Sequence, residues 1–474
     1  MALAPIARPR AVMGLMFYPR GGSAQVARML ARLLPESGWD VTLVSSSLTH
    51  PDHLGDARTF FAGLDTRPLD CTAALGAPDP LLADPPLHPS YEDRPGAPDR
   101  VFAAVDDATY AHQVAAWARA LDAAGAGSAD LLHLHHLTPL NAAAALVAPD
   151  VPVVGHLHGT ELLMLDAIAH GPPVGWTHAA AWAERMRQWA AACRLLLVPS
   201  PTMIPSACAL LGVPADHFRY LPNGVDTVRF DRRPVDRQAL WQRLLVDEPR
   251  GWAPGEPPGS VAYTHEALQA FTAAPVLLYV GRFTALKCLD RLIAAYALAR
   301  PAFAVSTPLV LVGGFPGEWE GEHPLEAIAR TGAHGVYLAG WHDHAELPDI
   351  FNAADAIVLP SAQEPFGQVL VEGMACGLPA IAVDAGGPST IVVDGRTGWL
   401  VPPDGDVALA AALVEAVNDA VERRQRGEAA YTAMRERYGW PALAASLAAV
   451  YESIACTPIA PEPDGTSGQG EELN

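Results

Sequence analysis

The chain has 474 residues, half of them apolar, which suffices for two large domains and excludes intrinsic disorder and small disulfide-stapled folds. Its 31 Lys and Arg against 52 Asp and Glu give a net charge of −21, which repels nucleic acid and anionic surfaces. No apolar run reaches the roughly 18 residues that a membrane span needs, so the Ala-rich surface leaves only weak peripheral membrane contact open.

The cysteines and the N-terminus indicate the compartment. Six cysteines are scattered without a Cys-x-x-Cys pair, which predicts reduced thiols, a cytoplasmic location, and neither a zinc site nor a disulfide framework. The apolar run 11–18 resembles a signal peptide only superficially, because no small-residue cleavage site follows it. We therefore predict a buried first strand there.

A strand, a glycine-rich loop and a helix open the chain. After the strand come Gly21 and Gly22, and then apolar residues between 26 and 34 at offsets of 0, 3, 4, 7 and 8, which is one face of a helix. Gly38 ends this helix before a second strand at 41–44. The Gly21-Gly22 loop either presents backbone N–H groups to an anion or forms a simple tight turn. Without the full Gly-x-Gly-x-x-Gly pattern, a nicotinamide dinucleotide site is disfavoured.

Residues 50–100 are rich in Pro, Asp and Gly and are predicted as a long surface excursion. Regular patterning then resumes with helices at 110–124 and 182–193 and strands at 131–135, 151–156 and 195–199. Alternating strands and helices predict a parallel sheet covered on both faces.

Two histidine clusters, 133–136 and 156–158, interrupt this pattern. Histidines two residues apart share one face of a strand, as in a metal site, but no Asp or Cys at suitable spacing completes the set, so buried neutral histidines are favoured. His158-Gly159-Thr160 follows directly on a strand, at the sheet edge where open α/β folds bind ligands.

The C-terminal half repeats the plan. A strand at 275–280 leads into 281–287 and a helix, and further strands are predicted at 309–312, 335–339 and 356–359. Asp404-Gly405-Asp406 precedes an apolar helix and is interpreted as its N-cap rather than as a metal motif.

The most informative segment is 364–379. A proline near its start and Gly377 near its end delimit a short helix whose N-terminus offers N–H groups to a diphosphate. Glu364 and Glu372 are separated by about 12 Å of helical rise, the span from a sugar ring to a ribose across a diphosphate. A carboxylate at each end accepts hydrogen bonds from vicinal hydroxyls, as the binding of a nucleotide sugar requires.

This segment resembles the signature of the retaining glycosyltransferases of family 4, which begins Glu-Pro-Phe-Gly and places two acidic residues around seven others. Further matching motifs occur in order along most of the chain: Gly21-Gly22, His158-Gly159-Thr160, 222–226 with Phe230, Gly281 with Arg282 and Lys287, 386–388 and 395–402. Thr390 departs from the pattern, since many relatives carry a Glu there, and the segments 50–100 and 231–273 match nothing in it.

The resemblance implies an α/β GT-B fold, in which two Rossmann-like domains face a central cleft. It implies an N-terminal acceptor domain at 1–230, a hinge and insertion at 231–273, a C-terminal nucleotide-sugar donor domain at 274–439 and a helix at 440–456 that crosses back to the first domain. Residues 457–474 are polar and are predicted as a disordered tail.

The resemblance also implies the role of each site residue. Arg282 and Lys287, beside Gly281, would hold the donor diphosphate, and Glu372 the ribose hydroxyls. Glu364 would contact the transferred sugar, near the N–H groups of Phe366, Gly367 and Gln368. His158 would reach that sugar from the first domain, Gly21 and Gly22 would line the acceptor or diphosphate side, and the base would lie near Gly340 and Trp341.

The reaction implied is transfer of a sugar from a nucleoside-diphosphate sugar to a hydroxyl or amine of a small-molecule or glycolipid acceptor, with retained configuration. UDP-sugar is the favoured donor, with GDP- or ADP-sugar as alternatives, and neither cofactor nor metal is expected. Two rivals stay open: a sugar-nucleotide epimerase on the same fold and a catalytically silent nucleotide-sugar-binding subunit.

Composition alone singles out Lys287. It is the only lysine beside 30 arginines. A compact ammonium is not replaceable by a planar guanidinium where space is tight. We therefore expect Lys287 to be functional.

Overall fold

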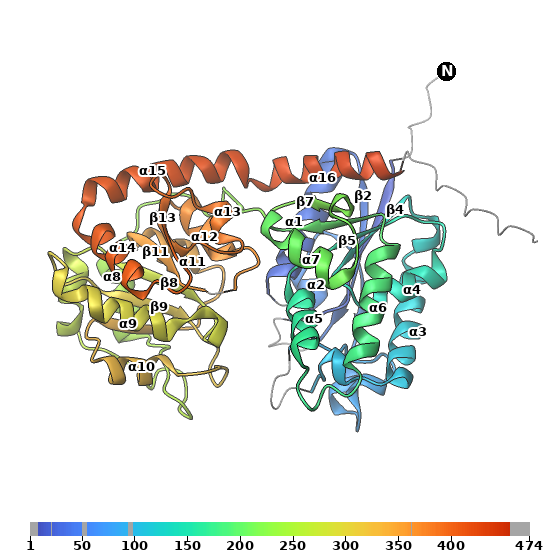
Figure 1. Cartoon of the computed structure of the whole chain (residues 1–474), viewed down its shortest axis with the longest axis horizontal. Helices are drawn as coiled ribbons and strands as arrows, with labels where there is room; N and C mark the ends of the chain where they lie inside the picture. The colour runs from blue at the N-terminus through green and yellow to red at the C-terminus, as the bar shows by residue number, and fades with distance from the viewer. Residues whose placement is uncertain (1–7, 20, 50–54, 93–97, 362, 456–474) are drawn as a thin grey trace, which may run out of the picture.

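The computed structural model describes residues 8–19, 21–49, 55–92, 98–361 and 363–455. Within this part of the chain, two parallel sheets form two halves that stand side by side (Figure 1). The chain has the α/β GT-B architecture, as the sequence predicts. The tail at 457–474 lies outside the described residues.

The first half contains a seven-stranded sheet of order β3-β2-β1-β4-β5-β6-β7 in the described residues. Its strands are β1 (Arg10–Leu15), β2 (Asp40–Ser47), β3 (Asp65–Asp70), β4 (Leu131–His135), β5 (Val153–His156), β6 (Leu195–Val198) and β7 (Phe218–Tyr220). Its helices are α1 (Gly22–Leu33), α2 (Ala57–Phe60), α3 (Asp107–Ala123), α4 (Pro139–Val147), α5 (Thr160–His170), α6 (Ala179–Ala192) and α7 (Ile204–Leu211).

The predicted surface excursion at 50–100 is partly wrong. Its described residues include β3, which pairs in parallel with β2 at the edge of the sheet. The strand has the sequence DTRPLD, and an edge strand tolerates Pro68 and several polar side chains because only one of its sides pairs. The apolar run that identifies a buried strand is therefore missing here.

The second half contains a six-stranded sheet of order β10-β9-β8-β11-β12-β13 in the described residues. Its strands are β8 (Leu277–Gly281), β9 (Leu309–Gly313), β10 (Val336–Gly340), β11 (Ala356–Leu359), β12 (Ala380–Val383) and β13 (Gly398–Val401). Its helices are α8 (Arg237–Gln242), α9 (Leu289–Ala299), α10 (Pro324–Thr331), α11 (Leu347–Asn352), α12 (Gln368–Ala375), α13 (Pro388–Ile391), α14 (Asp406–Asn418) and α15 (Ala420–Arg437).

The segment 231–273, expected as a hinge and insertion, packs into the core of the second half. Leu240, Trp241 and Trp252 belong to the same buried cluster as strands β8 to β11. The Trp241 indole N–H donates to the Ala353 carbonyl at 3.2 Å, and that of Trp252 to Gly314 at 3.0 Å. This segment is therefore part of the scaffold of the second half.

The N-cap predicted at Asp404-Gly405-Asp406 is wrong in detail. The N-cap of α14 is Gly405, and no side chain caps the helix. Asp406 lies in the first turn and accepts a hydrogen bond from Arg291 Nε at 2.8 Å. Its carboxylate is thus used to attach α14 to α9.

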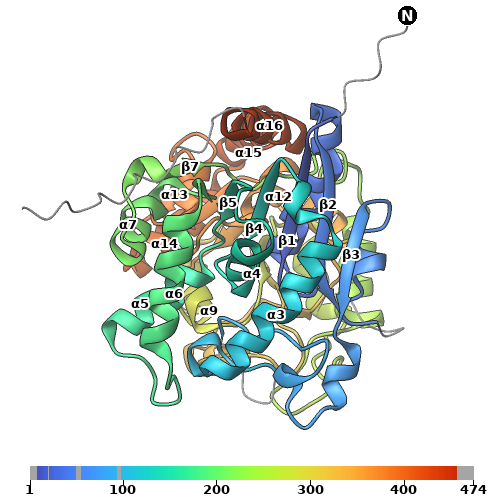
Figure 2. The same cartoon turned by 90° about the vertical axis from the view of Figure 1, so that its right-hand side faces the viewer.

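Helix α16 (Trp440–Ala455) crosses back to the first half, as predicted. Leu443, Leu447 and Tyr451 are buried in one cluster with β1 and α1. Figures 1 and 2 show α15 and α16 end to end along one side of the molecule, each over its own half. Two successive helices therefore connect the two cores.

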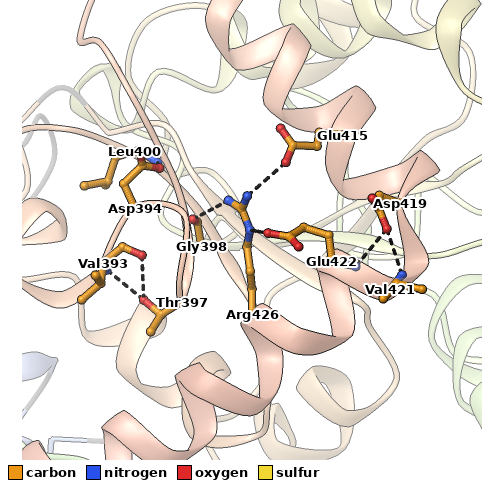
Figure 3. A network of polar contacts seen from close by, with 10 residues as sticks. All are labelled: Val393, Asp394, Thr397, Gly398, Leu400, Glu415, Asp419, Val421, Glu422 and Arg426. Carbon is orange, nitrogen blue, oxygen red and sulfur yellow. Dashed lines mark hydrogen bonds and ion pairs between the residues drawn. The ribbon is translucent and has the colours of Figure 1, made fainter.

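A buried arginine helps to fix helix α15 to the second half. Arg426 donates to Glu422 at 2.7 Å, to Glu415 at 3.0 Å and to the Gly398 carbonyl at 2.8 Å (Figure 3). Its guanidinium lies 4.0 Å from the centroid of the Trp399 ring. These contacts join α15 to α14 and to β13.

Among the described residues, no helix has the length and apolarity needed to cross a membrane.

Candidate active site

The two halves meet where strand ends of both sheets converge. Gly159 follows β5 and has a φ of 102°. A Cβ placed there would lie 2.5 Å from Cγ of Pro365, which comes from the loop between β11 and α12. Only a glycine permits this approach, and it brings His158-Gly159-Thr160 against the Glu-Pro-Phe-Gly segment.

Lys287 and Glu364 form an ion pair within the second half. Lys287 ends the short turn after β8, and its Nζ contacts Oε2 of Glu364 directly. The Lys287 side chain is 20% exposed and that of Glu364 11%. The sole lysine therefore neutralises the first acidic residue of the signature in a nearly closed environment.

The loop around Glu364 is held by backbone contacts. The Gly387 N–H donates to the Glu364 carbonyl at 2.8 Å. A Cβ on Gly387 would lie 2.1 Å from the Phe366 carbonyl oxygen, so the Gly386-Gly387 pair permits this packing. Gly367, at φ 103°, then starts α12 without a side-chain cap. The first N–H groups of α12 are consequently left to other acceptors.

Arg282 pairs with a carboxylate of the opposite half. Its NH1 and NH2 groups donate to the two oxygens of Glu92 at 3.1 and 3.0 Å. Glu92 belongs to the excursion at 50–100. The guanidinium predicted to bind a diphosphate is therefore engaged by a bidentate acidic group.

Glu372 is nearly buried, at 3% exposure, and belongs to a polar cluster on α12. Its Oε1 lies 2.9 Å from Nε2 of His344 and 3.3 Å from Nε2 of Gln368. Gln368 also donates to the Gly224 carbonyl at 3.0 Å. Through Gln368, Glu372 is therefore connected to residues 222–226, where the chain passes from the first half to the second.

A pocket lies between α1 and this cluster. Its lining includes Gln25, Arg28 and Met29 of α1, then Asp226 and Arg229, and then His344, Gln368 and Glu372. The pKa of Arg28 is lowered by burial and by the neighbouring charges of Arg32 and Arg229. Its guanidinium lies 4.6 Å from the Phe60 ring centroid. The pocket thus offers cations and carboxylates from both halves.

The two histidine clusters form one buried array. His133 Nδ1 lies 2.5 Å from the Tyr451 hydroxyl of α16, and its Nε2 lies 3.1 Å from His156 Nδ1. His135 Nδ1 lies 2.9 Å from His158 Nε2. Burial, reinforced by neighbouring imidazoles, lowers the pKa of His133, His135 and His158 well below the usual value, and burial lowers that of His156 to about 3. His133, His135, His156 and His158 are therefore held neutral.

As metal ligands, His133, His135 and His156 are close enough, since one nitrogen of each lies within 4.8 Å of the others. Their rings, however, are stacked, with interplanar angles of 10–23°. Both ring nitrogens of His133 are already engaged, Nδ1 by the Tyr451 hydroxyl and Nε2 by His156 Nδ1. The geometry favours hydrogen-bonded neutral histidines.

The remaining predicted residues lie around these groups. Gly21 and Gly22 are exposed at the start of α1, with no atom within 4 Å of a Cβ placed on either. Gly281 accepts from the Gly314 N–H at 3.2 Å. Gly340 packs against Arg250, whose carbonyl oxygen would lie 2.0 Å from an added Cβ, and the Trp341 ring meets Phe315 at 5.9 Å. Strand β10 thus ends against the segment 231–273.

Sequence reasoning missed Glu92, Arg28, Arg229 and His344. For His344 a signal existed, because it follows Gly340 at a predicted strand end, where ligand-binding side chains gather. Glu92 lies in a segment without periodicity, and nothing in its neighbourhood indicates a contact with Arg282, 190 residues away.

Comparison with known proteins identifies both halves. Residues 20–229 match the family described as Glycosyltransferase Family 4, and residues 263–433 match Glycosyl transferases group 1. A D-inositol 3-phosphate glycosyltransferase from Xylanimonas cellulosilytica is 30% identical over 329 residues, covering 68% of this chain and 71% of that protein. A glycogen synthase from Mycobacterium tuberculosis is 27% identical over 395 residues, covering 78% and 84%.

Solved structures share the fold. A sucrose-phosphate synthase from Thermosynechococcus elongatus aligns with a TM-score of 0.65 at 20% identity, covering 94% of this chain and 99% of that one. The Anabaena protein HepE, solved in complex with UDP-glucose, aligns with a TM-score of 0.63 at 18% identity, covering 94% and 99%.

The neutral histidine array predicts acid-sensitive stability. Histidines in an unfolded chain titrate at about pH 6.5. The pKa values of His133, His135 and His158 lie well below this value in the folded chain, and that of His156 is about 3. Below about pH 6.5 the unfolded chain therefore binds protons that the folded chain excludes, and stability present above that pH is lost on acidification. Each such histidine contributes up to ~1.4 kcal/mol per pH unit. Urea denaturation at pH 7.5, 6.5 and 5.5 measures this loss above the range where most carboxylates titrate.

The exposed His334 provides the control. His334→Asn should keep the wild-type pH dependence, and His156→Gln should make it shallower. Equal urea midpoints at pH 7.5 and 5.5 in the wild-type chain would contradict the prediction.

Proposed function

Because the chain belongs to glycosyltransferase family 4 and has the GT-B fold, we propose that it transfers a sugar from a UDP-sugar, with retained configuration, to an acceptor hydroxyl or amine. GDP- and ADP-sugars are the alternative donors. The proposed acceptor is a small molecule or a glycolipid. The observation that carries the proposal is the Lys287–Glu364 ion pair, which lies beside the uncapped start of α12.

In this proposal the donor diphosphate binds Arg282, Lys287 and the N–H groups of Phe366, Gly367 and Gln368. Two cations and a helix N-terminus provide the charge compensation that a divalent ion supplies elsewhere, so catalysis is proposed to need no metal. The Asp406 carboxylate of the Asp-x-Asp pattern is already paired with Arg291, which supports this part of the proposal.

Glu364 is proposed to contact the transferred sugar, and His158 to approach it from the first half. Two observations support this placement. Gly159 lies against Pro365, so His158 and Glu364 are each one residue from a direct contact between the halves. The His158 backbone N–H donates to Glu161 Oε1 at 2.7 Å, which fixes the turn before α5.

The proposed chemical step is attack of the acceptor oxygen or nitrogen on the anomeric carbon, from the face that the diphosphate leaves. The bond between that carbon and the diphosphate oxygen breaks, and the acceptor proton passes to the leaving diphosphate. Configuration is retained without a protein nucleophile. The cations at Arg282 and Lys287 stabilise the charge that develops on the leaving group.

Release of nucleoside diphosphate tests the proposal. We expect UDP release from a UDP-sugar, dependent on acceptor and undiminished by excess EDTA, with NMR showing the anomeric configuration of the donor in the product. The acceptor panel includes D-inositol 3-phosphate, because a relative carries that name. Acceptor-independent conversion to an epimeric sugar nucleotide would favour the epimerase, and donor binding without turnover would favour a silent subunit. Activity that is lost on chelation and restored by Mg²⁺ would contradict metal independence.

Lys287→Arg tests whether a compact cation is required. A guanidinium is larger and flatter than the ammonium that contacts Glu364, so its charge must lie about an ångström away, which can reduce turnover on the order of 100-fold. Steady-state kinetics of donor and acceptor measure the effect.

Arg119→Lys is the matched control, because Arg119 pairs with Asp84 on the exposed surface of the first half. Its turnover should stay within about twofold of wild type, as expected for a surface exchange. Wild-type turnover and donor KM in Lys287→Arg would remove Lys287 from the site.

Glu92→Gln tests whether Glu92 competes with the diphosphate for Arg282. The pair is exposed on both sides, so its removal should strengthen UDP binding by only about two- to fivefold. Calorimetry measures this affinity. In an Arg282→Ala background the substitution should have no effect, and Asp107→Asn, at another ion pair of the first half, should leave UDP binding unchanged. Equal UDP affinity in Glu92→Gln and wild type would show that Glu92 does not compete with the diphosphate for Arg282.

A further inference from the structure

His344 contacts the second acidic residue of the signature from outside the signature itself. It lies on the loop between β10 and α11, whereas Glu372 lies in the second turn of α12. Its Nε2 is 2.9 Å from Glu372 Oε1, and the ring stands 5.1 Å from the buried Phe230 ring. The imidazole is therefore oriented by packing on one side and by a carboxylate on the other.

The surroundings of the ring assign its tautomer. Nδ1 is buried and has no hydrogen-bond partner in the described part of the chain. A proton on Nδ1 would be an unsatisfied buried donor, whereas a proton on Nε2 is satisfied by Glu372. His344 thus donates through Nε2 to a side chain that can only accept.

The loop that carries His344 is fixed from its other side. Arg250 NH1 donates to Glu346 Oε2 at 2.9 Å, and the same oxygen accepts from the Asp343 N–H at 3.1 Å. The residue before His344 and the residue two positions after it are therefore tied to the segment 231–273. A histidine on such a loop can hold its partner in a defined orientation.

Glu372 Oε1 is occupied by two donors, His344 and Gln368. Among the described residues, Oε2 has no recorded hydrogen bond, and Glu372 lines the pocket between α1 and α12. With Oε1 occupied, rotation of the carboxylate would break two hydrogen bonds at once. The free accepting capacity of Glu372 is therefore confined to one oxygen in a fixed direction.

We propose that His344 is a positioning residue, which holds Glu372 so that its free oxygen accepts from the 2′-hydroxyl of a ribonucleoside diphosphate. The inference rests on the proposed function and deepens it, because it assigns the selection of ribose over deoxyribose to a residue outside the signature. The pocket prefers ribonucleotides only while His344 holds the carboxylate in place.

Calorimetric binding of UDP and of 2′-deoxy-UDP to the full chain tests this proposal. Wild type should bind UDP at least about 10-fold more tightly than 2′-deoxy-UDP, because only UDP can form the charge-assisted hydrogen bond to Glu372. His344→Leu should lose most of this preference while binding 2′-deoxy-UDP as wild type does. His344→Gln retains an amide N–H near the position of Nε2 and should recover the preference. Thermal unfolding checks that each variant folds, and His344→Ser replaces the leucine variant if that one does not.

A double-mutant cycle separates positioning from direct binding. In a Glu372→Ala background, His344→Leu should change UDP affinity by less than about twofold, because the group it positions is absent. Additive losses in the two variants would overturn the proposal. His334→Leu, an exposed histidine of the same half, is the matched control and should keep the wild-type preference.

The outcomes separate this inference from the function on which it rests. If wild type binds no nucleoside diphosphate, the proposed function fails. If UDP binds but 2′-deoxy-UDP binds equally well, or if His344→Leu keeps the preference, the role of His344 fails while the transferase proposal stands.

Discussion

The approach of Gly224 to the Trp440 indole is the contact on which the arrangement of the two halves depends. A Cβ at residue 224 would lie 2.4 Å from the indole ring, and the Val225 N–H donates to the Tyr438 carbonyl at 2.8 Å. The chain passes between the halves twice, near residue 225 and near residue 438. The two passages are therefore hydrogen-bonded to each other. Gln368 binds the Gly224 carbonyl, so the same joint also reaches α12 and Glu372. The joint between the two halves therefore lies beside one of the two acidic residues of the signature.

Both signature cations have carboxylate partners. Lys287 is paired with Glu364 within its own half, and Arg282 with Glu92 across the interface. A diphosphate bound as proposed competes with these carboxylates for the two cations, and each carboxylate that it displaces loses its ion-pair partner. The exposed Arg282 pair is weak and easily replaced, whereas the Lys287 pair is enclosed and fixes the cation in space. The two cations therefore differ: Arg282 can change its partner, whereas Lys287 is held in one position.

The sequence predicts what local patterns determine. The buried strands follow from apolar runs, and the crossing helix follows from the family resemblance. The resemblance assigns Lys287 and Glu364 to one site but does not predict their direct ion pair. Strand β3 could not be predicted, because an edge strand with Pro68 has no apolar run. Glu92 and Arg28 reach the interface through tertiary packing, which no spacing within their own segments encodes. The role of Gly340 as a packing position against Arg250 depends likewise on a segment 90 residues earlier.

Lys287 is the only lysine of the chain, which limits where amine-directed reagents can react with its side chains. Its Nζ is the one side-chain primary amine in the chain, and it is 20% exposed inside an ion pair. Acylating or reductively alkylating reagents, which modify most proteins at many lysines, find one side-chain target here, at the proposed diphosphate position. The extent of modification at Lys287, measured separately from that at any terminal amine, therefore reports the accessibility of its Nζ, without any engineered label.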